Sequence, residues 1–164
     1  MSAIELRITG AEALDLLEPL WLTLHHHHMK VAAPAAFQDD ATSWAARRAG
    51  YARWLSEDGS FVVLAERDGA AVGYAVVEML PGPDDTWVTG ARMAEVQTLA
   101  VAPAERGRGI GTMLLDAVDA RLAELGIGDV FIAVLTGNAD ALRFYERRGL
   151  RPVMTHLARF TAEG

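Results

Sequence analysis

A glycine-rich turn in the second half of the chain constrains the fold more than any other feature. The segment Arg106-Gly107-Arg108-Gly109-Ile110-Gly111 follows a predicted strand over 93–101 and leads into an amphipathic run that reaches Leu125. A strand, a glycine-rich turn and a helix in this order present free backbone N–H groups and the positive end of the helix dipole. The turn therefore predicts a site for a phosphate or pyrophosphate group.

Spacing separates three kinds of phosphate loop. A P-loop requires Lys and then Ser or Thr after its last glycine, whereas Gly111 is followed by Thr112 and Met113. The dinucleotide pattern G-x-G-x-x-G fails because its third glycine would fall on Thr112 or on Leu114. A third pattern, [Q/R]-x-x-G-x-[G/A], is satisfied in full by residues 106–111. We therefore expect neither a P-loop nor an NAD site.

Periodicity along the chain predicts a single α/β domain without repeats or a linker. The Asp68-Gly69 step predicts a tight hairpin, and the nearly all-apolar run 130–135 predicts an interior strand covered on both faces. Asn138 is expected to cap the last helix, and Gly126 and Gly149 are expected to follow helix ends. The predicted strands are 4–9, 61–66, 71–79, 93–101, 130–135 and 155–160, and the predicted helices are 11–28, 42–57, 112–125 and 138–148.

Charge and residue usage exclude several classes of partner and site. The formal net charge of −7 has the wrong sign for a domain that binds nucleic acid through a basic face. The absence of cysteine excludes a Cys nucleophile, a thiolate metal site and a disulfide scaffold, and fits a cytoplasmic protein. No apolar stretch approaches the roughly 20 residues that cross a bilayer, and the first five residues lack a signal-peptide pattern. We expect no nucleic acid and no membrane as partners.

The residues around the turn carry a resemblance to a known family. The pattern at 106–111 follows an L-x-V strand end at Leu99 and Val101, and residues 138–150 contain F-Y-x-x-x-G. In this combination the chain resembles the GNAT superfamily of acetyl-CoA-dependent N-acetyltransferases over residues 60–160. Residues 1–59 match only in the order strand, helix, helix, and this part of the family varies with the acceptor.

The resemblance implies a fold and a division of labour along the chain. Residues 1–164 would form one N-acetyltransferase domain, with a variable acceptor side in 1–59 and an acetyl-CoA-binding part in 60–160. The fold would be α/β, with a mixed, mostly antiparallel central sheet flanked by about four helices. The implied order is β-α-α-β-β-β-α-β-α-β, with a further strand allowed at the end.

The resemblance also implies which residues hold acetyl-CoA. The backbone of Leu99, Ala100 and Val101 would hydrogen-bond the pantetheine arm as an added strand does. Asn138 would bond the pantetheine near its middle, and Ala141 would leave room for it beside the last helix. The N–H groups of seven residues would cradle the pyrophosphate, namely Arg106, Gly107, Arg108, Gly109, Ile110, Gly111 and Thr112.

Acetyl transfer to an amine needs a neutral amine, a donor to the carbonyl oxygen and a proton for the departing thiolate. Tyr145, one helical turn after Ala141, resembles the family's proton donor; the alternative is that it only packs the last helix on the sheet. Glu95 is the carboxylate of an apolar strand and occupies a position where some members place a general base; the alternative is a solvent-facing Glu. Without a Cys nucleophile or a G-x-S-x-G motif, we expect direct transfer in a ternary complex.

Two features on the acceptor side leave alternatives open. His25 and His28 share a helix face within the run of four histidines and are interpreted as solvated helix-end residues, acceptor contacts or half of a metal site. Because two imidazoles leave a metal short of ligands, we expect no tight metal site. Trp87 either lines the acceptor site or anchors its loop.

Three function classes follow from these features. The leading hypothesis is an N-acetyltransferase that uses acetyl-CoA as cosubstrate and acetylates a primary amine of a small molecule or peptide. The alternative is a non-catalytic acyl-CoA-binding regulatory module, and a weaker one is a structural domain with a degenerate loop. Tyr145 favours the enzyme, because mere binding needs no proton donor. The acidic balance favours a cationic acceptor, and a homodimer is left open.

Overall fold

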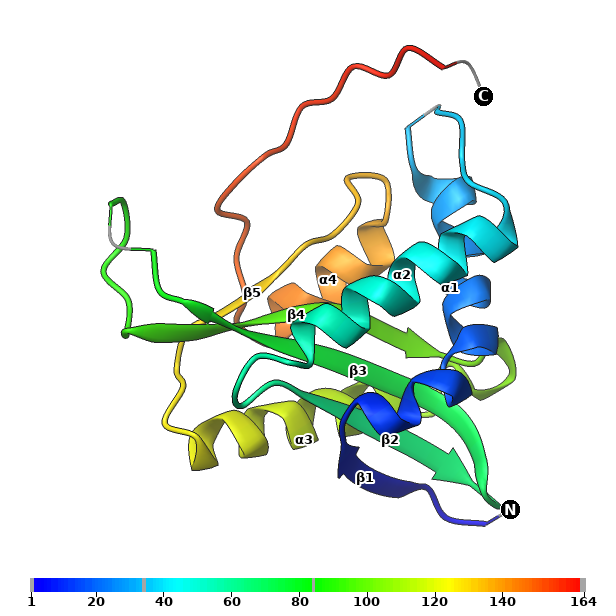
Figure 1. The fold of residues 1–164 in the computed structure, drawn as a ribbon, viewed down its shortest axis with the longest axis horizontal. Coiled ribbons are helices and arrows are strands. Elements are labelled where there is room, and N and C mark those ends of the chain that lie inside the picture. The colour runs from blue at the N-terminus through cyan, green and yellow to red at the C-terminus, as the bar shows by residue number, and fades with distance from the viewer. Residues whose placement is uncertain (1, 34, 84, 163–164) are drawn as a thin grey trace.

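A five-stranded sheet with helices on both faces forms the protein (Figure 1). The computed structural model describes residues 2–33, 35–83 and 85–162. The strands are β1 (Glu5–Thr9), β2 (Phe61–Arg67), β3 (Ala70–Pro81), β4 (Arg92–Val101) and β5 (Val130–Ile132). The helices are η1 (Ala11–Leu16), α1 (Glu18–Val31), α2 (Asp40–Trp54), η2 (Pro103–Glu105), α3 (Ile110–Glu124) and α4 (Ala139–Arg147), of which η1 and η2 are 3-10 turns.

The sheet is mixed and mostly antiparallel, as predicted. Its order is β1-β2-β3-β4-β5; the first three pairings are antiparallel, and β4 pairs with β5 in parallel. The hairpin between β2 and β3 turns at Asp68 and Gly69, whose φ angles of 53° and 77° are those of a type I′ turn. The Asp-Gly signal therefore located this turn correctly.

Each face of the sheet has its own apolar core. On one face the buried residues of α3, led by Ile110, Leu114 and Val118, pack on alternate residues of β2, β3 and β4. Gly73 of β3 permits this approach, because a Cβ there would lie 3.2 Å from side-chain atoms of Ile110 and Leu114 and 3.1 Å from a backbone oxygen. On the other face α1 and α2 pack through a second buried cluster that contains Trp21, Trp44 and Tyr51.

Three buried hydroxyl groups connect α2 to the sheet. The Tyr51 hydroxyl lies 3.0 Å from the Tyr74 hydroxyl of β3 and 2.6 Å from Oγ1 of Thr98 in β4. Burial raises the pKa of both tyrosines above the ordinary value, so both stay protonated at neutral pH. Because buried hydroxyls lose water on folding, this network holds α2 at one position over β3 and β4.

The structure corrects the first predicted helix. The run predicted as one helix over 11–28 is divided at Leu17 into η1 and α1. Pro19 lies in the first turn of α1, where its missing N–H costs no hydrogen bond, so the α-helix begins there.

The structure also corrects the last two predicted strands. The run 130–135 gives only the three-residue β5, which is an edge strand rather than an interior one. Residues 155–160 form no strand, and Leu157 and Phe160 are 93% and 63% exposed. Alternation gives a segment one apolar face, but a strand also needs a neighbour, and this segment runs away from the sheet (Figure 1).

The hydroxyl network generates a stability prediction. Tyr51→Phe removes two hydrogen bonds and leaves the Tyr74 and Thr98 hydroxyls without the partner they have now, so the free energy of unfolding should fall by about 2 kcal/mol. Tyr74→Phe removes one bond and should cost about 1 kcal/mol. Urea unfolding at 25 °C measures both; an equal or smaller loss in Tyr51→Phe would contradict the central place of its hydroxyl.

Candidate functional site

The predicted glycine-rich turn has the geometry of an anion site. Gly107 and Gly109 have φ angles of 73° and 80°, and a Cβ on either would meet nothing within 4 Å. The first backbone hydrogen bond of α3 runs from the Met113 N–H to the Gly109 carbonyl at 3.0 Å. The N–H groups of Ile110, Gly111 and Thr112 precede that bond, at the positive end of the helix dipole. The turn and α3 together suit a phosphate or pyrophosphate.

Ion pairs hold the turn in place. Glu105 accepts two hydrogen bonds from Arg67 of β2, at 3.2 and 3.1 Å, and pairs with Arg108 at 3.6 Å. The side chains of Arg67 and Glu105 are both only 14% exposed, which strengthens their attraction. Nε of Arg106 donates to the Val101 carbonyl at 3.3 Å. The two arginines of the motif therefore fix the loop backbone in this structure.

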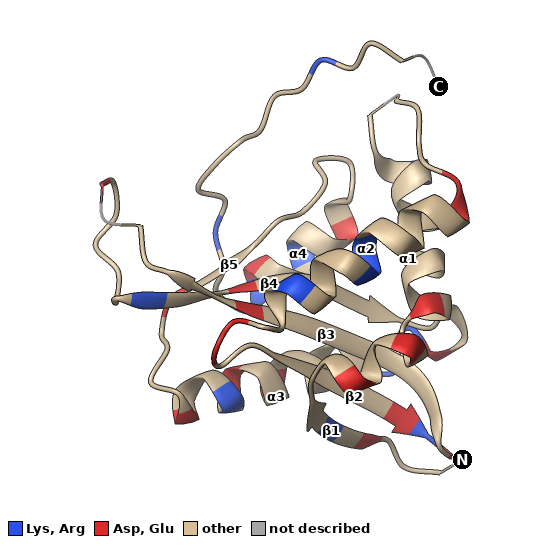
Figure 2. Cartoon of the chain, viewed as in Figure 1, with Lys and Arg blue, Asp and Glu red and all other residues tan. Residues whose placement is uncertain are grey.

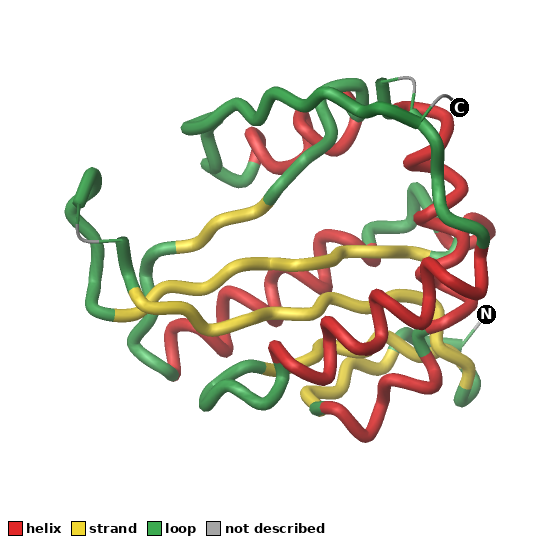
Figure 3. The backbone as a smooth tube through the Cα atoms, turned by 45° about the horizontal axis from the view of Figure 1, so that its top comes forward, coloured by secondary structure: helices red, strands yellow, loops and turns green. Residues whose placement is uncertain are grey.

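β4 separates from its parallel neighbour just before the turn. Only Ala94–Val96 pairs with Val130–Ile132 of β5, and Figure 3 shows the two strands diverging beyond that point. Leu99, Ala100 and Val101 pair with β3 on one edge, and within the described chain no strand pairs with their other edge. This free edge lies next to the glycine-rich turn, so an extended ligand can add to it as a strand does.

A bulge in β4 sets which side chains face α1 and α2. Val76 pairs with Thr98 and Val77 with Val96, which leaves Gln97 as the extra residue. Val96 belongs to the α3 core, whereas Thr98, two residues later, bonds to Tyr51 of α2. The alternation of side chains therefore shifts at the bulge.

Two carboxylates face each other on the α1 and α2 side of the sheet. Glu78 and Glu95 are directly opposite in the β3–β4 register, and their chain neighbours Val77 and Val96 pack in the core on the other face. Glu78 is 8% exposed, and its Oε2 accepts from Gln97 Nε2 at 2.6 Å. Burial, and then the charge of Glu78, raise the pKa of Glu95 above its ordinary value. Glu95 is therefore a carboxylate with a raised pKa, one residue before the last β4–β5 pair.

α4 packs beside the N-terminal part of α3. Phe144 lies 3.5 Å from the position of a Cβ on Gly111, and Arg148 forms 2.8 Å ion pairs with Asp116 and Asp119 of α3. Asn138 caps the helix, as predicted, by accepting from the Ala141 N–H at 3.4 Å. α4 is therefore attached to the end of α3 that carries the turn.

Tyr145 is the buried residue of α4. It is 8% exposed, and its hydroxyl forms no hydrogen bond with any residue that the structure describes. Burial raises the pKa of this phenol well above 10, so it keeps its proton through neutral pH. This hydroxyl, on a buried ring and without a described protein partner, is available to a ligand.

The histidines of α1 differ in their surroundings. His25 is 7% exposed and its Nε2 donates to the Gln38 carbonyl at 2.9 Å, which ties α1 to the segment before α2. Burial and the nearby charges of His27, Arg47 and His25 lower the pKa of His28 to about 4, so it is a neutral imidazole at neutral pH. Among the described residues no three His, Cys, Asp or Glu side chains are grouped to hold a metal.

Trp87 contacts the edge strand β5 at the residue that pairs with Glu95. Its ring packs edge-to-face on Phe131 of β5, with ring centroids 5.7 Å apart. This contact anchors the segment before β4, which was one of the two interpretations of Trp87.

The sequence prediction missed two residues of this region, Glu78 and Arg47. Glu78 is the charged residue of an otherwise apolar strand, a signal as strong as the one that pointed to Glu95. Arg47 lies at helical spacing between Trp44 and Tyr51, two buried residues of α2. Both residues break an apolar pattern, and that interruption was the available signal.

Comparisons with known proteins agree with this geometry. Residues 21–150 match the acetyltransferase (GNAT) family. A mycothiol acetyltransferase of Rhodococcus opacus (strain B4) is 30% identical over 131 residues, which are 77% of this chain and 42% of the relative. An L-2,4-diaminobutyric acid acetyltransferase of Nocardia farcinica (strain IFM 10152) is 29% identical over 124 residues, 73% of this chain and 58% of the relative. The chain thus spans about half the length of these relatives.

A solved structure shares the fold. An aminoglycoside N-acetyltransferase, AAC(6′)-Iy in complex with CoA, superposes with a TM-score of 0.73 at 18% identity, covering 99% of this chain and 97% of the other. In the described part of this chain no helix is long and apolar enough to span a membrane.

The turn generates a binding prediction. In Gly109→Glu the new side chain enters the open space over the α3 N–H groups, so CoA affinity measured by calorimetry should fall at least about 100-fold while circular dichroism stays native. Gly69→Glu is the matched control, because Gly69 has a similar φ of 77°, also meets nothing within 4 Å, and lies in the distant β2–β3 hairpin. Unchanged CoA affinity in Gly109→Glu would show that the turn is not the site.

Proposed function

This chain belongs to the acetyltransferase (GNAT) family, and we propose that it transfers an acetyl group from acetyl-CoA to a primary amine of a small molecule or peptide. The observation that carries the proposal is the anion-binding turn at the start of α3 beside the free edge of β4. One ligand that has both a pyrophosphate and an extended amide-bearing arm fits these two features together. The absence of cysteine favours a cytoplasmic enzyme.

We assign acetyl-CoA to the side of the sheet edge that α3 and α4 border. The backbone of Leu99, Ala100 and Val101 would hold the pantetheine arm. Asn138 would bond the arm through the amide nitrogen that its cap leaves free, and Ala141 would make room for it. The pyrophosphate would lie on the N–H groups of the turn, namely those of Arg106, Gly107, Arg108, Gly109, Ile110, Gly111 and Thr112.

The reaction proceeds by direct attack in a ternary complex. The amine nitrogen attacks the thioester carbonyl carbon, a C–N bond forms, and the C–S bond of the tetrahedral intermediate breaks. Glu95 takes the proton that the amine loses, directly or through a water, and Tyr145 gives a proton to the departing thiolate. A phenol that stays protonated and a carboxylate with a raised pKa suit these opposite tasks.

The acceptor side is built by α1, α2 and the sheet face that carries Glu95. The names of the relatives mention mycothiol, a diamino acid and aminoglycosides, so they do not agree on one acceptor. We propose His28 rather than His25 as the acceptor contact, because His25 is committed to the Gln38 carbonyl. Trp87 would contribute by fixing the loop that borders β5.

The test is a screen of amines, aminoglycosides, amino acids and N-terminal peptides, read by the release of free CoA. Amine-dependent CoA release is the expected result. Tight CoA binding without release on any amine would favour a non-catalytic acyl-CoA-binding module. Absence of CoA binding would overturn the proposal.

Tyr145→Phe tests the proton donor. The variant keeps the ring and loses the hydroxyl, so kcat should fall by roughly 10²–10⁴ while CoA affinity barely changes. The melting curve is measured alongside, because a loss of more than about 1 kcal/mol would indicate a structural hydrogen bond instead. Turnover at the wild-type rate across pH would exclude Tyr145 as the acid.

The pH dependence tests Glu95. A general base works only when deprotonated, so kcat should fall as the pH drops through the raised pKa of Glu95. Glu78→Gln removes the facing charge, which lowers the pKa of Glu95 and moves this acid limb to lower pH. The same amine is used with the wild type and with Glu78→Gln, so the ionisation of the amine affects both pH profiles equally. Glu95→Gln should lose about 10²-fold or more in kcat, and an unshifted limb in Glu78→Gln would contradict the assignment.

A further inference from the structure

Arg47 of α2 is a cation that pairs with no described acid on the acceptor side of the sheet. Its guanidinium lies 4.1 Å from the ring centre of Trp21 and 5.8 Å from those of Tyr51 and Trp54. Within the described residues it makes no hydrogen bond and no ion pair, although a guanidinium carries five N–H donors. The side chain is half-buried, so water reaches only part of it.

The ring that supports Arg47 is held rigidly. Trp21 is 5% exposed, and its Nε1 donates to the Ser43 hydroxyl at 3.0 Å. Stacking on a fixed ring orients the plane of the guanidinium and leaves the N–H groups at its edge unsatisfied. If Arg47 only packed the helix, its aliphatic stem and the flat face of its guanidinium would suffice. The N–H groups at the edge of the guanidinium would then have no role.

His28 borders the same place. Its ring packs edge-to-face on Trp21 with centroids 6.3 Å apart, and Arg47 is one of the charges that lower the pKa of His28. The ring nitrogens of His28 form no hydrogen bond with a described residue, so the neutral ring offers one N–H donor. Arg47 and His28 therefore both contact the Trp21 ring, Arg47 from α2 and His28 from α1.

Arg47 and the carboxylate pair lie on the same face of the sheet. Arg47 neighbours Tyr51, which bonds to Thr98 of β4, and Glu95 precedes Thr98 by three residues, about 10 Å along the strand. The face therefore has an acidic end at Glu78 and Glu95 and a basic end at Arg47. A molecule with an amine at one end and an anion at the other matches both.

We propose that Arg47, on its Trp21 platform and beside His28, binds a carboxylate of the acceptor, which is thus an amine that also carries a carboxylate, such as an amino acid or short peptide. The inference rests on the proposed acetyl transfer. A carboxylate fits this group, because one planar guanidinium matches two carboxylate oxygens in a bidentate pair.

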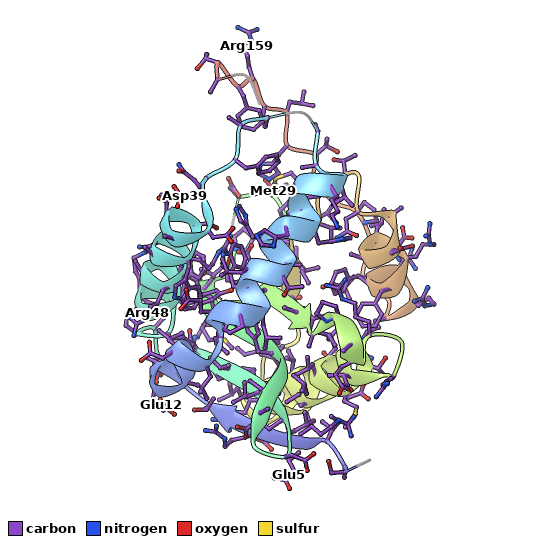
Figure 4. The ribbon with its side chains drawn as sticks, turned by 90° about the vertical axis from the view of Figure 1, so that its right-hand side faces the viewer. Glu5, Glu12, Met29, Asp39, Arg48 and Arg159 are labelled. Carbon is purple, nitrogen blue, oxygen red and sulfur yellow. The ribbon has the colours of Figure 1, made fainter. Side chains whose placement is uncertain are left out.

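The experiment compares Arg47→Gln with Arg48→Gln. Arg48 is the matched control, because it is the next residue and its charge is paired with Asp15 at 2.8 Å. Figure 4 labels Arg48 at the outer side of α2, and Figure 2 shows the Lys and Arg positions of this helix in blue. Amino acids and dipeptides are tested beside their C-terminal amides, and kcat/KM is measured by CoA release. We expect the wild type and Arg48→Gln to prefer the acid about tenfold or more, and Arg47→Gln to lose this preference. An acid-to-amide ratio near one in the wild type, or a ratio unchanged in Arg47→Gln, would overturn the proposal while leaving acetyl transfer intact.

A second measurement tests the carboxylate site when no amine is acetylated, and a second variant tests it when Arg47→Gln is unstable. Calorimetric titration of the CoA-bound protein with 5-aminovalerate and with its amide detects the carboxylate site without turnover, because CoA carries no acetyl group. Binding of the acid but not of the amide, lost in Arg47→Gln and kept in Arg48→Gln, supports the site even if no amine is acetylated; no binding of the acid to the wild type overturns it. If Arg47→Gln melts well below the wild type, Arg47→Lys decides, because it keeps the charge and loses the fork. It should reduce the preference severalfold, and an unchanged preference there would count against the site.

Discussion

The unequal pairing of β4 on its two edges is the constraint on which the rest of the site depends. β3 pairs with β4 along its whole length, whereas β5 pairs with three residues only. A strand that is satisfied on one edge and open on the other can accept a ligand without losing its place in the sheet. Because the open stretch is followed by the glycine-rich turn, the arm of one ligand would lie on the strand edge and its pyrophosphate on the turn in our proposal.

Opposite charges are kept at separate places on the acceptor face. Glu78 and Glu95 face each other one residue before the last β4–β5 pair, and their mutual repulsion and burial favour a proton or a cation between them. Arg47 is supported by aromatic rings rather than by an acid, so its charge stays available. The net charge of −7 alone predicted a cationic acceptor; the local arrangement refines this to a molecule with both signs.

The sequence predicted most of the fold and the cosubstrate half of the site, because these depend on local patterns. The turn at 106–111, the Asp68-Gly69 hairpin and the Asn138 cap act through backbone geometry that short motifs encode. Glu78 and Arg47 each interrupt an apolar pattern, but what lies opposite them follows from strand register and from the packing of α1 on α2, which a local pattern does not give. The strand predicted at 155–160 was wrong for a related reason, because the sequence of a segment does not show whether a neighbouring strand is there to pair with it.

The Tyr51–Thr98 hydrogen bond has a further consequence for how the two halves of the site communicate. Thr98 directly precedes the stretch of β4 whose free edge faces the cosubstrate side, while its side chain reaches the helix that carries Arg47. A shift of this backbone on one side is transmitted through a 2.6 Å contact to the wall on the other. Thermodynamic reciprocity requires that any change which occupancy of one half makes in the affinity of the other is matched by the same factor in reverse.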